Sequence, residues 1–182
     1  MDTTSLRLAY AGLLEAGEHV AGADRSTPPP PGEWDAGQLL AHLVSVDAAV
    51  LAAAYTVVAG GHGTFDNRQS LDLWNLERIS NRAGGEAHLR RRIRTQGEAL
   101  CALAEQLSDQ ELAQPIPTLL LSRDTVLVDG PVSLGDLIAG LADDHLPRHT
   151  QQLLALLPPS SSMGRPGLQL AGMPGADGAE DG

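Results

Sequence analysis

Two histidines near the C-terminal part of the sequence could hold a metal ion together. His145 and His149 lie four residues apart in DDHLPRHTQQLL, residues 143–154. Four residues make about one turn of an α-helix, so both imidazoles should leave the same face of one helix. Apolar residues share that face: Ile138, Leu141, Leu153 and Leu156. The pair is therefore expected to point into the core, where neutral imidazole is a common metal ligand.

A third histidine with an inward-facing pattern lies far away in the sequence. His42 shares a stripe at helical spacing with Leu39, Val46 and Ala49. Three inward histidines on two helices can meet inside a helical bundle and hold one ion. The alternative is that each is a core histidine that forms a hydrogen bond with a neighbouring residue. The spacing alone leaves both interpretations open.

Other polar residues near the histidines have two interpretations each. Asp47, Asp143 and Asp144 could orient an imidazole or act as a base, although solvated acids are the favoured interpretation for two of the three. Gln152 lies one turn from His149, where it either contacts the ligand sphere or fills polar space.

Three further features favour a structural role. The basic run Arg90, Arg91, Arg92 and Arg94 could bind an acidic thiol cofactor or substrate, but a solvated helix face is the favoured interpretation. Cys101 lies between leucines and should be a small core residue. Trp34 should pack at the start of a helix, with a place in the pocket as the lesser alternative.

The elements that must position these residues are mostly helical. Periodic apolar residues predict helices over 4–22, from Asp35 to about 59, and over 70–83, 86–107 and 133–157. Asp35 and Gln38 have the spacing of a capping box, and Ser133 with Asp136 can cap the last helix. Residues 61–69 should form a loop, and residues 115–132 a short hairpin or two extended strands. Pro147 should kink the last helix between its two histidines.

Composition limits the class of protein. The 182 residues suit one domain, and the wealth of Leu and Ala favours an all-α bundle. A net charge of -11 and only 3% aromatic residues disfavour nucleic acid and anionic membranes as partners. No stretch is expected to span a membrane, and a single cysteine suits a reducing cytoplasm. The expected domain covers residues 1–158, followed by a disordered acidic tail rich in Gly, Pro and Ser at 159–182.

Several segments resemble one protein family. EWDAGQLLAHL, which contains Trp34 and His42, resembles a motif of DinB/YfiT-like proteins, and DDHLPRHTQQL resembles their C-terminal HxxxHxxQ signature. FDNRQSLDLWNLER and LSDQEL are similar to the actinobacterial branch related to mycothiol-dependent maleylpyruvate isomerase. The resemblance covers roughly residues 4–157.

This resemblance implies an up-down four-helix bundle, with the hairpin-like segment as an insertion before the last helix. It also implies a divalent metal, zinc or nickel, with His42, His145 and His149 as ligands. Three protein ligands leave positions open, as in a catalytic site. The implied function is a metal-dependent transferase or isomerase that uses mycothiol or a similar thiol and a small-molecule substrate. A non-catalytic binding or dimerisation module and a metal-dependent hydrolase are the alternatives. The resemblance also makes a homodimer a candidate assembly, because helix-bundle faces in this family often pair.

Overall fold

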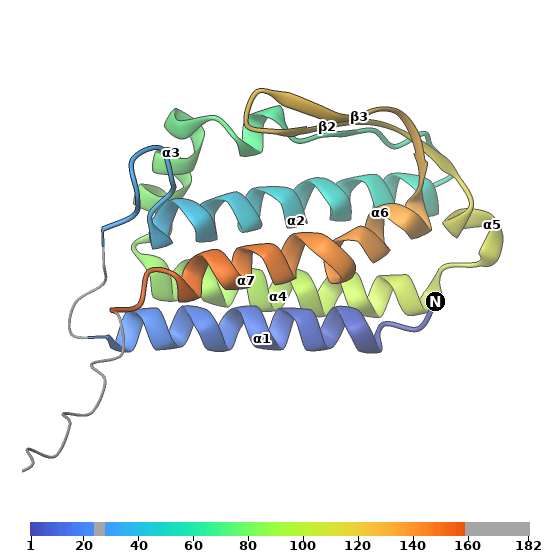
Figure 1. The fold of residues 1–182 in the computed structure, drawn as a ribbon. Coiled ribbons are helices and arrows are strands. Elements are labelled where there is room, and N and C mark those ends of the chain that lie inside the picture. Colours follow the sequence, from blue (N-terminus) through green and yellow to red (C-terminus); the bar gives the residue numbers. More distant parts are fainter. Residues whose placement is uncertain (24–27, 159–182) are drawn as a thin grey trace, which may run out of the picture.

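Long helical rods packed side by side form the body of the molecule (Figure 1). The computed structural model describes residues 1–23 and 28–158. The rods are α1 (Thr4–Gly22), α2 (Ala36–Val58), α4 (Glu86–Gln106), and a final rod in which α6 (Leu134–Gly140), the π-helical turn η2 (Leu141–His145) and α7 (Leu146–Leu154) follow one another. Shorter elements are the 3-10 turn η1 (Arg68–Ser70), α3 (Leu73–Ala83) and α5 (Asp109–Leu112). The helical bundle expected from the sequence is thus present in its main features.

The order in which the rods run differs from the expected up-down arrangement. The colour gradient of Figure 1 shows that α2 and α4 run in the same direction, opposite to α1 and to the final rod. The reason lies in the connection between α2 and α4, which was expected to be a simple loop followed by a helix. Instead, residues 59–85 carry the chain back along α2, and α3 packs against α2 on the way.

Side-chain caps fix the ends of several helices at the places that the sequence predicts. Asp35 accepts a hydrogen bond from the Gln38 backbone N–H at 2.7 Å, and the Gln38 side chain accepts one from the Asp35 N–H, so the capping box at the start of α2 is complete. The Ser133 hydroxyl caps α6 by accepting a hydrogen bond from the Asp136 backbone N–H at 3.0 Å. Gly84 ends α3 at a φ of 78°, a left-handed conformation that glycine adopts without a steric penalty.

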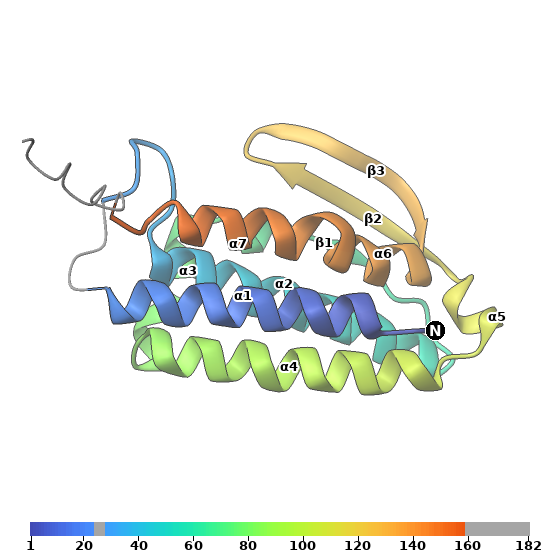
Figure 2. The same cartoon turned by 60° about the horizontal axis from the view of Figure 1, so that its bottom comes forward.

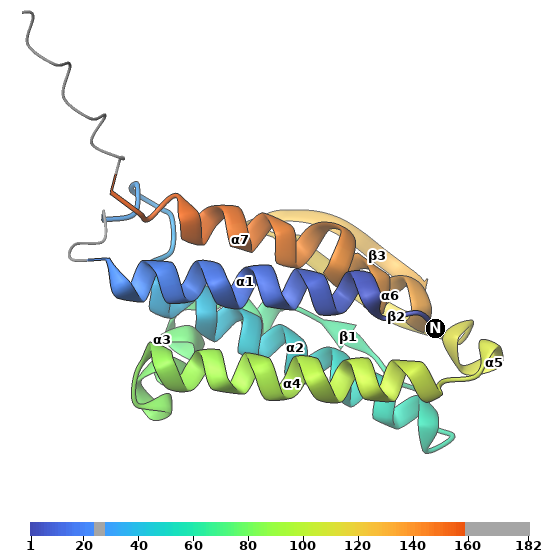
Figure 3. The same cartoon turned by 90° about the horizontal axis from the view of Figure 1, so that it is seen from below.

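Leucines from every rod fill the core between α1, α2, α4 and the final rod. The large side chains with almost no exposure include Leu13, Leu39, Leu43, Leu89, Leu100, Ile138 and Leu146. Figures 2 and 3, which show the bundle from other sides, place α1 between α4 and α7. The ring of Tyr10 lies directly over Gly97 of α4, where an added Cβ would approach it to 2.9 Å. Gly97 therefore lets α1 and α4 approach closely at this point.

A small sheet covers one side of the bundle (Figure 2). Strands β2 (Pro115–Ser122) and β3 (Thr125–Ser133) form the expected antiparallel hairpin, with an irregularity between Leu120 and Leu121. A third strand, β1 (Phe65–Asp66), pairs with β2 in parallel. It lies within residues 61–69, so the expectation that this whole segment is a loop is wrong. A two-residue strand whose partner lies about fifty residues away leaves no local pattern in the sequence.

Helix α2 bears on the expectation that no stretch spans a membrane. By length and composition, Ala36–Val58 is apolar enough to do so. In this fold, however, α2 packs against α3, α4 and the final rod and carries the fully buried Asp47. This position is that of a core helix. The disordered tail predicted for residues 159–182 lies outside the described residues.

Candidate metal centre

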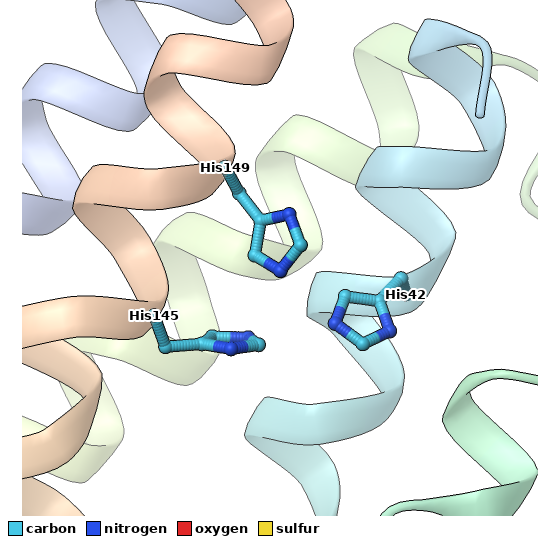
Figure 4. Close-up of side chains that lie close together, drawn as sticks. All are labelled: His42, His145 and His149. Carbon is cyan, nitrogen blue, oxygen red and sulfur yellow. The ribbon is translucent and has the colours of Figure 1, made fainter. Parts of the chain in front are cut away.

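The fold brings His42, His145 and His149 together. One ligand nitrogen from each imidazole lies within 4.8 Å of the others. Figure 4 shows the three rings pointing toward one another, His42 from α2 and the other two from the final rod. His42 and His149 are almost completely buried, with 2% and 7% of their surface exposed. Two segments about a hundred residues apart in the sequence therefore form one compact cluster.

Hydrogen bonds fix which nitrogen two of these imidazoles present. Nδ1 of His42 lies 2.6 Å from the backbone oxygen of Ser70, and Nδ1 of His149 lies 2.6 Å from Oε1 of Gln152. Both partners are oxygen atoms that accept hydrogen bonds, so each Nδ1 carries the proton and donates it. The lone pair of each neutral ring is then on Nε2. Such a bond at the far nitrogen is the usual support for a metal-binding histidine.

His145 supplies the observation that tests whether the cluster fits a metal. Its Nε2 is buried and has no hydrogen-bond partner among the described residues. A buried polar nitrogen without a partner is costly, and a native structure seldom leaves one unexplained. Together with the Nε2 atoms of His42 and His149, it makes a set of three nitrogen donors of the type that divalent zinc or nickel takes. The residues present fit such an ion.

Burial keeps all three imidazoles neutral. Removal from water lowers the pKa of His42 to about 3, with His149 nearby lowering it further. Burial likewise lowers the pKa of His149 to about 4, although the hydrogen bond that His149 donates to Gln152 raises it in part. The pKa of His145 is lowered well below its ordinary value by burial and then by its two neighbours. At neutral pH each ring therefore keeps the lone pair that a metal needs.

The kink expected at Pro147 takes the form of a π-helical turn. Proline has no N–H, so the carbonyl of Asp143 cannot receive its usual helical hydrogen bond. The turn at Leu141–His145 comes just before, and the N–H of Leu146 bonds to the carbonyl of Leu141 across the wider π-helical loop. α7 then begins with the proline in its first turn, where the missing donor costs nothing. The two histidines stay close, with ring centroids 4.5 Å apart.

Trp34 forms a wall of the cluster, which sequence reasoning placed second to a packing role at the start of α2. Its ring centroid lies 4.8 Å from that of His42. It also stacks on His149 at 6.4 Å, with an angle of 18° between the planes. The only sequence signal for this contact was the position of Trp34 just before the capping residue, two turns upstream of His42.

The three candidate carboxylates do not bind the imidazoles. Asp144 forms an ion pair with Arg148, and Asp143 is exposed, as expected for solvated acids. Asp47 is fully buried but accepts a hydrogen bond at 2.7 Å from the hydroxyl of Tyr10 on α1. Burial raises the pKa of Asp47 to about 7, and the hydrogen bond from Tyr10 lowers it only in part. This pair belongs to the core between α1 and α2 and takes no part in the cluster.

Cys101 and the arginines of the basic run on α4 differ in how far they are buried. Cys101 is in the core, as expected, with 1% exposure. Arg91, Arg92 and Arg94 are exposed on α4. Arg90 differs, because its side chain is only 15% exposed and packs across Gly17 of α1. The basic run therefore forms no continuous basic surface beside the histidines.

Comparison with known proteins identifies one family. No curated protein and no solved structure matches the chain. The model of one family, the DinB superfamily, matches residues 5–153. This range includes all but the end residues of the rods, and all three histidines. The chain therefore belongs to the DinB superfamily.

Proposed function

We propose that this protein binds a divalent metal through His42, His145 and His149 and uses it in a reaction of a low-molecular-weight thiol such as mycothiol. The reaction class would be transfer or isomerisation. The observation that carries the proposal is the composition of the cluster. Among the described residues, its members are three imidazoles, with no carboxylate and no cysteine.

Neutral ligands leave the charge of a divalent ion uncompensated. In a buried site this favours an anion at an open position, because interactions between charges are stronger there than in water. When bound, the ion would accept a thiolate and lower the pKa of the corresponding thiol. A thiolate sulfur is also a ligand that zinc takes readily.

The protein's own residues would hold and shield this site. Ser70 and Gln152 keep the protons of His42 and His149 on Nδ1, so that both Nε2 atoms face the centre. Trp34 covers one side and excludes water from it. No acid or base within the cluster competes for the thiol proton, so that proton would leave to solvent as the thiol binds.

Metal analysis and titration test the proposal. Protein purified without a histidine tag should carry about one equivalent of zinc or nickel. Replacement of His42, His145 or His149 by Ala should each lower that occupancy sharply, whereas His88→Ala, on an exposed position, should not.

A cobalt-loaded sample should then show a new sulfur-to-metal absorption band when mycothiol is added, but not when its S-methyl derivative is added. Absence of metal in protein that is correctly folded would contradict the metal site. Metal without a thiol band would contradict the thiol chemistry and favour a binding module or a hydrolase.

A further inference from the structure

An exposed ion pair joins the loop that carries Trp34 to the β2–β3 hairpin. Trp34, which contacts His42 and His149, lies in the loop before α2. The preceding residue, Glu33, pairs with Arg123 at the tip of the β2–β3 hairpin. The hairpin therefore reaches the loop that carries the aromatic wall of the site.

The hairpin is held by a pair of hydrogen bonds at one point, whereas its tip is exposed. Asn67, which is 4% exposed, donates to the carbonyl of Leu121 at 2.8 Å and accepts from its N–H at 2.9 Å. This pair of hydrogen bonds holds β2, at its irregularity between Leu120 and Leu121, against the segment after β1. Beyond it, Val126 and Leu127 are about half exposed, and Arg123 has a φ of 53°, which a residue other than glycine rarely adopts.

We propose that the Glu33–Arg123 pair acts as a latch that holds the Trp34 loop closed over the three-histidine site, so that metal and substrate enter when the latch opens. The inference rests on the proposed metal site. The loop and the hairpin tip meet at this ion pair, and the hydrogen bonds of Asn67 hold β2 in place just before the tip.

The strength of the pair suits a latch that opens readily. The side chains of Arg123 and Glu33 are 73% and 36% exposed. Exposed ion pairs are weak, so loss of this one should raise the open fraction by only about two- to five-fold. Salt screens such pairs, and added salt should therefore act in the same direction.

Charge reversal and charge exchange test the latch. The variants are Glu33→Arg, Arg123→Glu and the double variant that carries both changes and restores the pair in reverse. All are made in a Trp74→Phe background, so that tryptophan fluorescence reports Trp34 alone. Arg94→Glu is the matched control, because it breaks another exposed pair, with Glu18, that joins α1 to α4.

Two measurements are made on each variant. Acrylamide quenching of Trp34 fluorescence, which needs no metal, should increase about two- to five-fold in both single variants and return to the original value in the double variant. The rate at which dipicolinate removes zinc from the loaded protein should follow the same pattern. The Arg94→Glu control should change neither measurement.

The outcomes separate this inference from the proposed function. Single variants that quench like the parent protein, or a double variant that does not recover, would overturn the latch. If the protein binds no zinc, the metal site fails, whereas the quenching series still decides whether the pair holds the loop closed.

Discussion

The hydrogen bonds at Nδ1 of His42 and at Nδ1 of His149 differ in whether a single substitution of the acceptor residue can remove them. His42 donates to the backbone carbonyl of Ser70, and this carbonyl is still present when another residue replaces Ser70. The Ser70 hydroxyl also donates a hydrogen bond to the Ser45 hydroxyl of α2 at 2.9 Å, which holds this turn in place. His149 donates to a side chain, that of Gln152. The contribution of this outer bond to metal binding can therefore be measured at Gln152 alone.

Replacement of Gln152 should change metal affinity without changing the fold. Gln152→Leu removes the acceptor for His149 and frees its ring to rotate, so zinc affinity should fall about 10- to 100-fold. Gln152→Glu supplies a carboxylate acceptor, which makes the imidazole a stronger donor, and affinity should be kept or rise. Competition with a chelator measures both. Equal affinity in the Leu variant and the parent protein would show that Gln152 does not position His149.

Asp47 should make the protein less stable as the pH rises. Its pKa is about 7 in the folded protein, against an ordinary value of 3.8 that applies to the unfolded chain. The folded state thus holds the proton more tightly, so this contribution to stability is complete below about pH 4 and is lost as the pH rises through 7. The full loss is on the order of 4 kcal/mol.

The neutral variant Asp47→Asn isolates this effect. It keeps an oxygen that can accept the hydrogen bond from the Tyr10 hydroxyl, and it leaves the three histidines unchanged. The difference in urea unfolding free energy between variant and parent should grow in favour of the variant from pH 5 to pH 8. A difference that does not vary with pH would mean that the buried carboxyl titrates as an ordinary one.

At the scale of single residues, the sequence predicted which histidines face the core but not which residues their side chains contact. Helical spacing was enough to place His145 and His149 on one face, and the apolar stripe of His42 was enough to predict that it is buried. The carbonyl of Ser70 has no signature, because every residue has one. The bond between Tyr10 and Asp47 joins two helices, and only tertiary packing decides it.

Elements were predictable where a local rule sets their ends. The capping residues Asp35 and Ser133 begin α2 and α6 as expected, because side-chain caps depend only on neighbours three residues away. Strand β1 and the parallel course of α2 and α4 depend on pairing and packing between distant segments. The π-helical turn is intermediate: Pro147 predicted a distortion, but not its type or place.

Replacement of Pro147 should test whether the π-helical turn positions His145. Pro147→Ala restores an N–H that can donate to the Asp143 carbonyl and so favours a regular α-helix through this region. A regular helix would rotate His145 relative to His149, and zinc affinity should fall about ten-fold, while helix content by circular dichroism is kept. Gln151→Ala, at an exposed position on α7, is the control. Unchanged affinity in Pro147→Ala would show that the turn has no role in the site.

For the whole molecule, the cluster links the two halves of the chain. His42 lies near the start of α2, and the other two histidines lie in the final rod. A ligand that needs all three can bind only when α2 and that rod are packed together. The net charge of -11 also favours the approach of cations over that of anions. Metal binding should therefore depend on the global fold and stabilise it.

Zinc should raise the melting temperature of the metal-free protein. A ligand that binds only the folded state adds about 2.7 kcal/mol at a free concentration of 100 times its dissociation constant. For a chain of this size that corresponds to an increase of about 5–10 °C. Differential scanning calorimetry of metal-free protein, with and without zinc held free by a chelator buffer, measures the shift. The triple variant His42→Ala, His145→Ala, His149→Ala should show none. An equal shift in that variant would mean that zinc stabilises the protein at another place, and no shift in the parent protein would mean that the histidines serve as core residues.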